Sequence, residues 1–131
     1  MRWKALSAAV AITAACSTIG CDGMPFASPG DKEALRNSCY IGVNTCKKRC
    51  RADDCVSACN AGLGDCIENI DEYPPKEWEP ADAFHDGCTD ACSDDECSNA
   101  CYSGQNAIAT DSGPRLRKYG VITFNDRGQR D

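Results

Sequence analysis

CYIGVNTCKKRCRADDCVSACNAGLGDC, residues 39–66, contains six cysteines separated by six, three, four, three and six residues. This spacing reads the same in both directions about a midpoint between Ala52 and Asp53. Cysteines at positions i and i+4, or i+7 and i+11, lie on one face of a helix. The stretch therefore predicts two helices, each with a stripe of three cysteines.

The two stripes face each other if the chain reverses direction between them. Residues 51–54 separate the stripes, and four residues suit a tight helix–helix turn. Residues that face each other then have numbers that sum to 105. The expected disulfides are Cys39–Cys66, Cys46–Cys59 and Cys50–Cys55, and Leu35 is expected to meet Ile70. Six cysteines allow fifteen connectivities, so this nesting needs independent support.

An internal repeat of 42 residues provides a second view of the same unit. CKKRCRADDCVSACNAG (46–62) aligns without a gap on CTDACSDDECSNACYSG (88–104), and all four cysteines match. Both segments follow the pattern C-x3-C-x4-C-x3-C. The second copy is therefore expected to form a hairpin with the disulfides Cys88–Cys101 and Cys92–Cys97.

The outer cysteine pair supports the nesting. A shift of 42 residues places Cys39 on Ala81 and Cys66 on Ile108, so both outer cysteines are absent together. Loss of one partner would leave an unpaired thiol, whereas joint replacement by apolar residues keeps the face buried. Pairing within one C-x3-C is disfavoured because the two side chains point in parallel along the helix, which suits the disulfide dihedral poorly.

The fold class is therefore all-α, with two disulfide-stapled antiparallel helical hairpins. Ser28-Pro29-Gly30-Asp31 predicts the start of the first helix. Ser93-x-x-Glu96 reads as a capping box before the last helix, and Gly113-Pro114 as a stop signal after it. The expected segments are a signal peptide (1–20), a tether (21–30), a hairpin with three nested disulfides (31–70), an acidic Pro-rich linker (71–80), a hairpin with two nested disulfides (81–110) and a poorly ordered tail (111–131).

The tail contains one strand-like run, Tyr119–Phe124. No partner strand is evident, so we expect either an edge strand packed on a hairpin or a disordered, mildly basic segment.

The N-terminus predicts export. MRWK is a short basic region, and the following fifteen or so apolar or small residues suit a signal peptide but are too few to span a bilayer. Thr18-Ile19-Gly20-Cys21 resembles the lipobox of bacterial lipoproteins, which implies lipidation of Cys21. Cleavage before Cys21 leaves an even ten cysteines to pair, whereas cleavage at the second candidate, Cys16, leaves eleven. The alternative is ordinary signal cleavage and free secretion.

Twelve cysteines in 131 residues are typical of an exported disulfide scaffold. Removal of residues 1–20 takes away Arg2 and Lys4 and leaves 12 Lys and Arg against 20 Asp and Glu, a net charge of −8. This balance argues against non-specific binding to nucleic acid or to anionic membrane surfaces. Contact with the membrane is expected through the N-terminal lipid only.

Two parts of the chain are candidate contacts for an unknown protein partner. The first turn, residues 47–51, is basic, and the corresponding second turn, residues 93–96, is acidic. The turns either dock together, meet a partner, or are solvated helix ends without a partner. Trp78, in a linker with three prolines, either packs back on a hairpin or presents an exposed contact. The candidate interaction residues are Lys47, Lys48, Arg49, Arg51 and Trp78.

No catalytic motif is present, and no cofactor or metal is expected. Zinc on each set of four cysteines is the main rival to disulfides, but structural zinc motifs more often use C-x2-C, and export favours oxidation. His85 is the only histidine, and no nucleophile motif surrounds it. Asp94-Asp95-Glu96 lacks the spacing of a calcium loop, and glycine-rich phosphate loops are absent.

Twin C-x3-C hairpins resemble the α-hairpinin peptides and, more distantly, the helical-hairpin proteins of the mitochondrial intermembrane space. The resemblance covers residues 35–70 and 81–108, and the Cys-Pro-Cys of the redox members of the mitochondrial group is missing. We expect a non-enzymatic, lipid-anchored structural or protein-interaction module of a bacterial cell envelope. The alternatives are a secreted α-hairpinin-like effector or protease inhibitor that uses the turn around Arg51, and a thiol redox or metal-binding protein.

Overall fold

Two helical hairpins form where the cysteine spacing predicts them. The structure is a computed structural model, and it describes residues 28–121. The first hairpin comprises α2 (Pro29–Lys48) and α3 (Asp53–Glu72), and the second comprises α4 (Pro80–Asp90) and α5 (Asp95–Arg117), with a short 3-10 helix, η2 (Pro75–Glu77), between them. Residues 28–121 contain no strand. The predicted fold class, all-α with two disulfide-stapled antiparallel hairpins, is confirmed.

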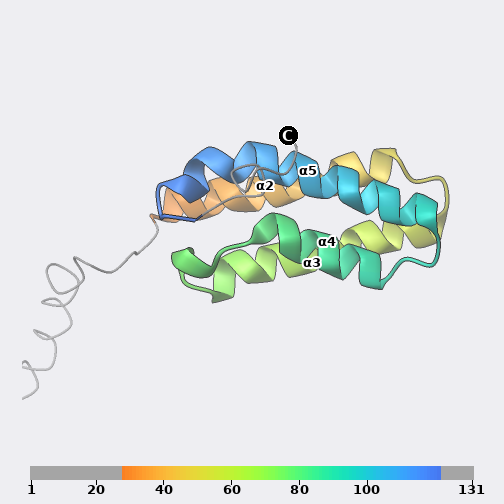
Figure 1. Cartoon of the computed structure of the whole chain (residues 1–131), viewed down its shortest axis with the longest axis horizontal. Coiled ribbons are helices and arrows are strands. Elements are labelled where there is room, and N and C mark those ends of the chain that lie inside the picture. The colour runs from red at the N-terminus through yellow and green to blue at the C-terminus, as the bar shows by residue number, and fades with distance from the viewer. Residues whose placement is uncertain (1–27, 122–131) are drawn as a thin grey trace, which may run out of the picture.

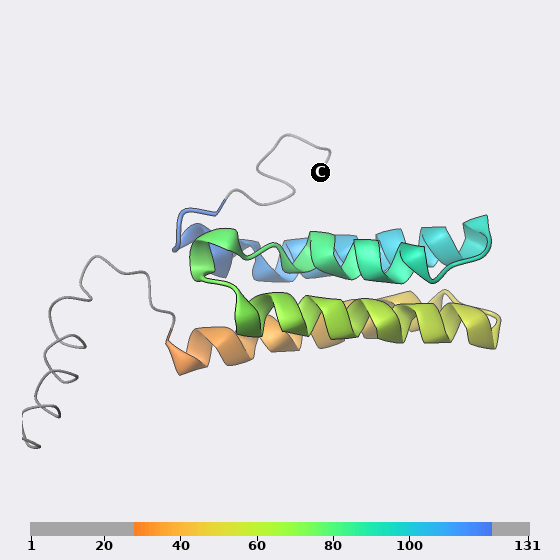
Figure 2. The same ribbon diagram turned by 90° about the horizontal axis from the view of Figure 1, so that it is seen from below.

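The two hairpins pack into an up-down-up-down four-helix bundle. Figure 1 shows α2 and α5 in one layer and α3 and α4 in the other. Figure 2 shows the bundle from below, with each hairpin seen as a separate antiparallel pair. Both hairpin turns lie at one end of the bundle, and the connection that contains η2 lies at the other. Short loops of this kind are typical of bundles with this topology.

Five disulfides staple the hairpins, three between α2 and α3 and two between α4 and α5. Their Cα–Cα distances of 5.5–5.9 Å fall in the usual range for such bonds. The pairs are the ones that the symmetric cysteine spacing and the repeat predict: Cys39–Cys66, Cys46–Cys59, Cys50–Cys55, Cys88–Cys101 and Cys92–Cys97. Leu35 and Ile70 are both completely buried in the same core, one turn beyond the outer disulfide. The cystines thus take much of the place that large apolar side chains occupy in other bundles.

The two copies of the 42-residue repeat are related by an approximate two-fold axis between the hairpins. A Cβ atom on Gly62 of α3 would lie 2.7 Å from the carbonyl oxygen of Phe84 in α4. A Cβ on Gly104 of α5 would lie 2.8 Å from the carbonyl oxygen of Gly42 in α2. Gly62 and Gly104 are 42 positions apart, and so are Gly42 and Phe84. The two interfaces between hairpins are therefore equivalent in the repeat. Both require glycine, because the backbones approach closely there.

Residues at the helix starts give one confirmation and one correction. Ser28 caps α2 and accepts a hydrogen bond from the backbone N–H of Asp31 at 3.0 Å, as predicted. The expected capping box at Ser93 is wrong, because the cap of α5 is Asp94, whose carboxylate accepts from the N–H of Cys97 at 2.9 Å. Asp94 corresponds in the repeat to Ala52, which occupies the N-cap position of α3. The helices α3 and α5 therefore begin at equivalent positions of the repeat.

The predicted end of the last helix is also wrong. The expected stop at Gly113-Pro114, and with it the boundary of the tail at residue 111, is contradicted because α5 continues to Arg117 with Pro114 inside it. Proline removes one backbone hydrogen bond from a helix. Burial of Leu116 and of Gly113 on the core side compensates, while Pro114 itself is exposed. Tertiary packing thus overrides the local signal.

The segment after α5 is held against the start of α2. The Tyr119 hydroxyl donates to the Asp31 carboxylate at 2.5 Å, and Lys118 Nζ donates to the same oxygen at 2.9 Å. These two hydrogen bonds, that from Tyr119 first, lower the pKa of Asp31, while burial and then the bond to Asp31 raise the pKa of Tyr119. Residues 119–121 do not form a strand, and the rest of the predicted strand-like run lies outside the described residues.

Candidate interaction site

An acidic groove lies along the layer formed by α3 and α4. Its volume is about 560 Å³, and its lining combines two helices with the connection between them. The charged side chains on its walls are those of Asp65, Glu68, Glu77, Glu79, Asp82 and Asp86, with Lys76 as the single base. Tyr73, which is about half exposed, adds an aromatic ring at the margin. The groove is thus suited to a cationic group with some apolar surface.

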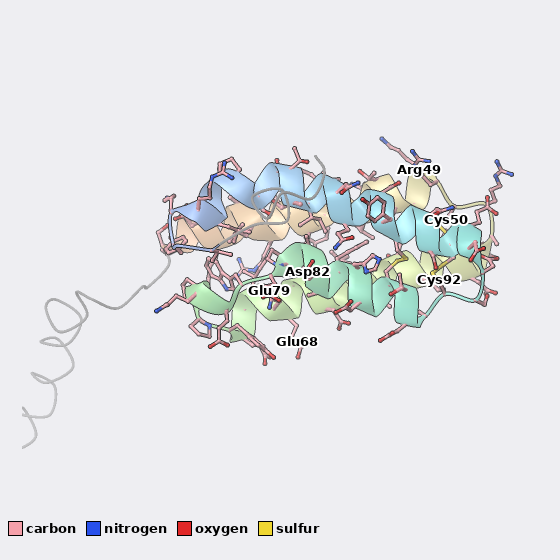
Figure 3. The ribbon with its side chains drawn as sticks, in the orientation of Figure 1. Arg49, Cys50, Glu68, Glu79, Asp82 and Cys92 are labelled. Atoms are coloured by element: carbon pink, nitrogen blue, oxygen red, sulfur yellow. A yellow bond between two sulfur atoms is a disulfide. The ribbon has the colours of Figure 1, made fainter. Side chains whose placement is uncertain are left out.

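Each wall of the groove follows from helical spacing. Asp82 and Asp86 are four residues apart and lie on one face of α4. Glu68 comes from the neighbouring helix α3, and Glu79 is the N-cap residue that precedes α4. Figure 3 labels Glu68, Glu79 and Asp82 along this side of the bundle. Gln105 of α5 donates to the Asp82 carboxylate at 3.1 Å, which ties this wall to the other layer.

Two hydrogen bonds hold the connecting segment in place. The backbone N–H of Glu79 donates to the side-chain oxygen of Asn69 at 2.8 Å. The indole N–H of Trp78 donates to the carbonyl oxygen of Ile70 at 3.1 Å. The Trp78 ring is completely buried and packs edge-on against Tyr119, with ring centroids 5.4 Å apart. The hypothesis that Trp78 is an exposed partner contact is therefore wrong, and the alternative, that it packs back on the bundle, is confirmed.

The two layers of the bundle differ strongly in charge. Residues 53–90, which form α3, the connection and α4, contain 11 Asp and Glu and one Lys. Residues 29–51, which form α2 and its turn, contain six Lys and Arg against two acids. Residues 95–118 of α5 have three of each. One layer thus carries a net charge of −10 and the other +4, although the sequence as a whole is moderately acidic.

The basic turn is exposed at the opposite end of the bundle from η2. Lys47, Lys48 and Arg49 are exposed at the end of α2, and the side chain of Arg51 is 83% exposed. Arg51 Nε lies 3.3 Å from the Glu96 carboxylate in the second hairpin. The expected docking between the basic and acidic turns is thus represented by one exposed ion pair, which contributes on the order of 0–1 kcal/mol.

The remaining candidates for chemistry have simpler roles. His85 is one-third exposed, and its Nδ1 lies 3.8 Å from the carboxylate of the next residue, Asp86. Three groups of cysteine sulfurs within residues 28–121 are close enough together to hold a metal ion. Every one of these cysteines is disulfide-bonded, and a disulfide sulfur is not the thiolate that zinc requires. Cys21, the expected lipidation site, lies outside the described residues.

Sequence reasoning identified the basic turn but missed the groove. The signal was present, because residues 71–96 contain ten acids against the single base Lys76. The groove itself needs α3 to pack beside α4, and those two helices belong to different hairpins. Hairpin pairing alone does not place them together.

Comparisons with known proteins identify no relative, so the arrangement of helices, disulfides and charges is the main evidence about function. No protein-family model matches this chain, and no significant match was found to a curated protein or a solved structure. Within residues 28–121, no helix is both long and apolar enough to cross a membrane. The class that the structure defines is a disulfide-stapled four-helix bundle with segregated charge.

Proposed function

We propose that this chain is an exported, lipid-anchored protein-interaction module of a bacterial cell envelope. The lipobox-like sequence that ends at Cys21 supports the anchor. The five disulfides support an oxidising compartment, where such bonds persist. In this proposal the bundle is a rigid scaffold, and its role is to bind rather than to catalyse.

The separation of charge between the two layers is the observation that carries the binding role. A layer with a net charge of −10 attracts cations and repels anions. The partner we propose is a protein segment rich in Lys and Arg that lies in the acidic groove, with the ring of Tyr73 against its apolar stems. Nucleic acid is not a suitable occupant of the groove, because its phosphates would face the acidic side chains of the lining.

Binding to the groove predicts a selective effect of charge reversal. Glu68→Lys/Glu79→Lys is expected to weaken binding of a Lys-rich peptide, for example decalysine, at least tenfold at low salt, because two attractive contacts become repulsive. Isothermal titration calorimetry of the exported protein measures this change. The matched control is Glu33→Lys/Asp90→Lys, which makes the same change in net charge at exposed positions outside the groove lining. Equal weakening by both variants would contradict a binding site in the groove.

The proposed anchor predicts a specific covalent mass. Mass spectrometry of the intact exported protein is expected to show a chain that begins at Cys21 with a diacylglyceryl group and has no thiol that can be alkylated. Cys21→Ala is expected to abolish the lipid mass. An unlipidated mature chain would favour free secretion, and free thiols at Cys88, Cys92, Cys97 and Cys101 would contradict the disulfide scaffold.

The basic turn supports a second candidate function, a secreted effector or inhibitor of the α-hairpinin type. Its four cations are exposed at the end of the bundle, and the side chain of Arg51 is 83% exposed. In this case the turn, rather than the groove, would contact the target. Charge reversal of Lys47, Lys48, Arg49 and Arg51 would then abolish the effect.

A further inference from the structure

The disulfides next to each turn contact the neighbouring disulfide of the same hairpin. Cys50 Sγ lies 3.5 Å from Cys59 Sγ, although these two sulfurs belong to different disulfides. In the second hairpin, Cys92 Sγ lies 3.4 Å from Cys101 Sγ. Each distance is a direct contact between a sulfur and the next disulfide. Thiol–disulfide exchange proceeds by attack of a thiolate on a disulfide sulfur, so such contacts are the starting geometry for exchange.

A third contact joins the two hairpins. Cys46 Sγ lies 3.7 Å from Cys88 Sγ, and both sulfurs are completely buried. The two cysteines are 42 residues apart and are equivalent in the repeat, so this contact lies at the approximate two-fold axis. Four disulfides therefore form one continuous row of sulfur atoms from the first turn, through the core, to the second turn.

The two ends of this row differ in charge. Cys50 is partly exposed and lies between Arg49 and Arg51 in the chain. Cys92 is also partly exposed, but the residues that follow it are Ser93 and Asp94. Figure 3 labels Arg49, Cys50 and Cys92 toward the turn end of the bundle. Nearby cations stabilise a thiolate, so the first turn is the more reactive end.

We propose that these four disulfides form an internal thiol–disulfide exchange path from Cys50 to Cys97, with a Cys46–Cys88 bond between the hairpins as its product. The proposal is independent of binding in the acidic groove. It gives the molecule a second covalent state in which the two hairpins are cross-linked.

The path begins when an external dithiol, such as dithiothreitol, reduces the Cys50–Cys55 bond. The dithiol is oxidised to a disulfide. The two electrons that it gives up reduce Cys50 and Cys55 to thiols or thiolates. The Cys50 thiolate then attacks Cys59 Sγ, forms Cys50–Cys59, and releases Cys46 as a thiolate. One bond forms and one breaks, so the number of thiols is unchanged.

The second half of the path crosses the bundle. The Cys46 thiolate attacks Cys88 Sγ, forms Cys46–Cys88, and releases Cys101. The Cys101 thiolate attacks Cys92 Sγ, forms Cys92–Cys101, and releases Cys97, which takes a proton from solvent. After the first reduction no further oxidant or reductant is needed, because every later step is an isomerisation.

Two single variants test the path without any added reductant. Cys55→Ser leaves Cys50 as a free thiol in contact with Cys59. Cys50→Ser removes the same disulfide but leaves the thiol on Cys55, which does not belong to the close cluster of Cys46, Cys50 and Cys59. Each exported variant is incubated at pH 8 under native conditions, quenched with acid, alkylated with N-ethylmaleimide, and mapped by tandem mass spectrometry.

The expected result for Cys55→Ser is a transfer of the label from Cys50 to Cys97, together with peptides linked through Cys46–Cys88. Cys50→Ser is expected to keep its label on Cys55 and its four native disulfides. A Cys55→Ser protein with no Cys46–Cys88 linkage would overturn the proposal. If the variant does not fold, the unaltered protein with one equivalent of dithiothreitol gives the same readout, with labels on Cys55 and Cys97 expected and labels confined to Cys50 and Cys55 as the contrary result.

Discussion

Gly104→Ala is expected to lower the free energy of unfolding by about 2 kcal/mol and the melting temperature by roughly 10 °C. The added Cβ would lie 2.7 Å from a ring carbon of Phe84 and 2.8 Å from the backbone oxygen of Gly42. The backbone oxygen cannot move without displacing α2, so the two helices must separate. Thermal unfolding followed by circular dichroism at 222 nm measures the change.

The matched control for this prediction is Gly64→Ala, in α3. Gly64 is exposed, and a Cβ there would meet no atom within 4 Å. Alanine is favoured over glycine inside a helix, so this variant is expected to gain about 0.5–1 kcal/mol. Opposite signs for the two substitutions would show that close packing, and not helix propensity, requires glycine at 104. A Gly104→Ala protein as stable as the parent would contradict the close approach of α2 and α5.

The disulfide pairing could be predicted from the sequence because it depends on local geometry. Helical spacing places the cysteines of each helix in one stripe, and a four-residue turn fixes the register of the partner stripe. The second repeat lacks counterparts of both Cys39 and Cys66, which supports a bond between these two cysteines over the other possible connectivities. Each of these arguments needs only one hairpin, and no knowledge of how the hairpins pack.

Two of the errors in prediction depend on contacts between distant parts of the chain, whereas the error at Ser93 is a local shift of the helix start by one residue. Gly113-Pro114 predicts an end for α5 that is too early, because this local signal does not reveal the burial of Leu116. The buried position of Trp78 depends on its bond to Ile70 and on the ring of Tyr119. These partners are distant in sequence or lie across a proline-rich segment, so local signals do not reveal them.

The two candidate sites also differ in whether they depend on local sequence or on the packing of the hairpins. The exposed cations of the basic turn are adjacent in sequence, so their clustering was evident from the sequence. The acidic groove combines Glu68 of α3 with Asp82 of α4, which come together only when the two hairpins pack side by side. A repeat that predicts two equivalent hairpins does not by itself predict which of their faces meet.

Joint replacement of the outer disulfide, Cys39→Ala/Cys66→Ile, is expected to lower the free energy of unfolding by about 3 kcal/mol while the bundle still folds. The bond joins residues 27 positions apart, and its loss gives the unfolded chain more freedom. The second hairpin shows that this face tolerates the pair, because its equivalent residues, Ala81 and Ile108, are buried. Equilibrium unfolding in urea measures the loss.

The slope of the urea transition distinguishes a change in the unfolded state from a change in native packing. Without the outer bond the unfolded chain exposes more surface, so the slope is expected to rise as stability falls. Cys39→Ala alone removes the same cross-link but also leaves a cavity and a buried, unpaired Cys66, so its loss should exceed that of the double variant. A double variant with unchanged stability would mean that the outer bond constrains nothing that the inner bonds of the hairpin do not already constrain. A single variant that is no less stable than the double variant would mean that apolar packing at this level does not replace the disulfide in the second hairpin.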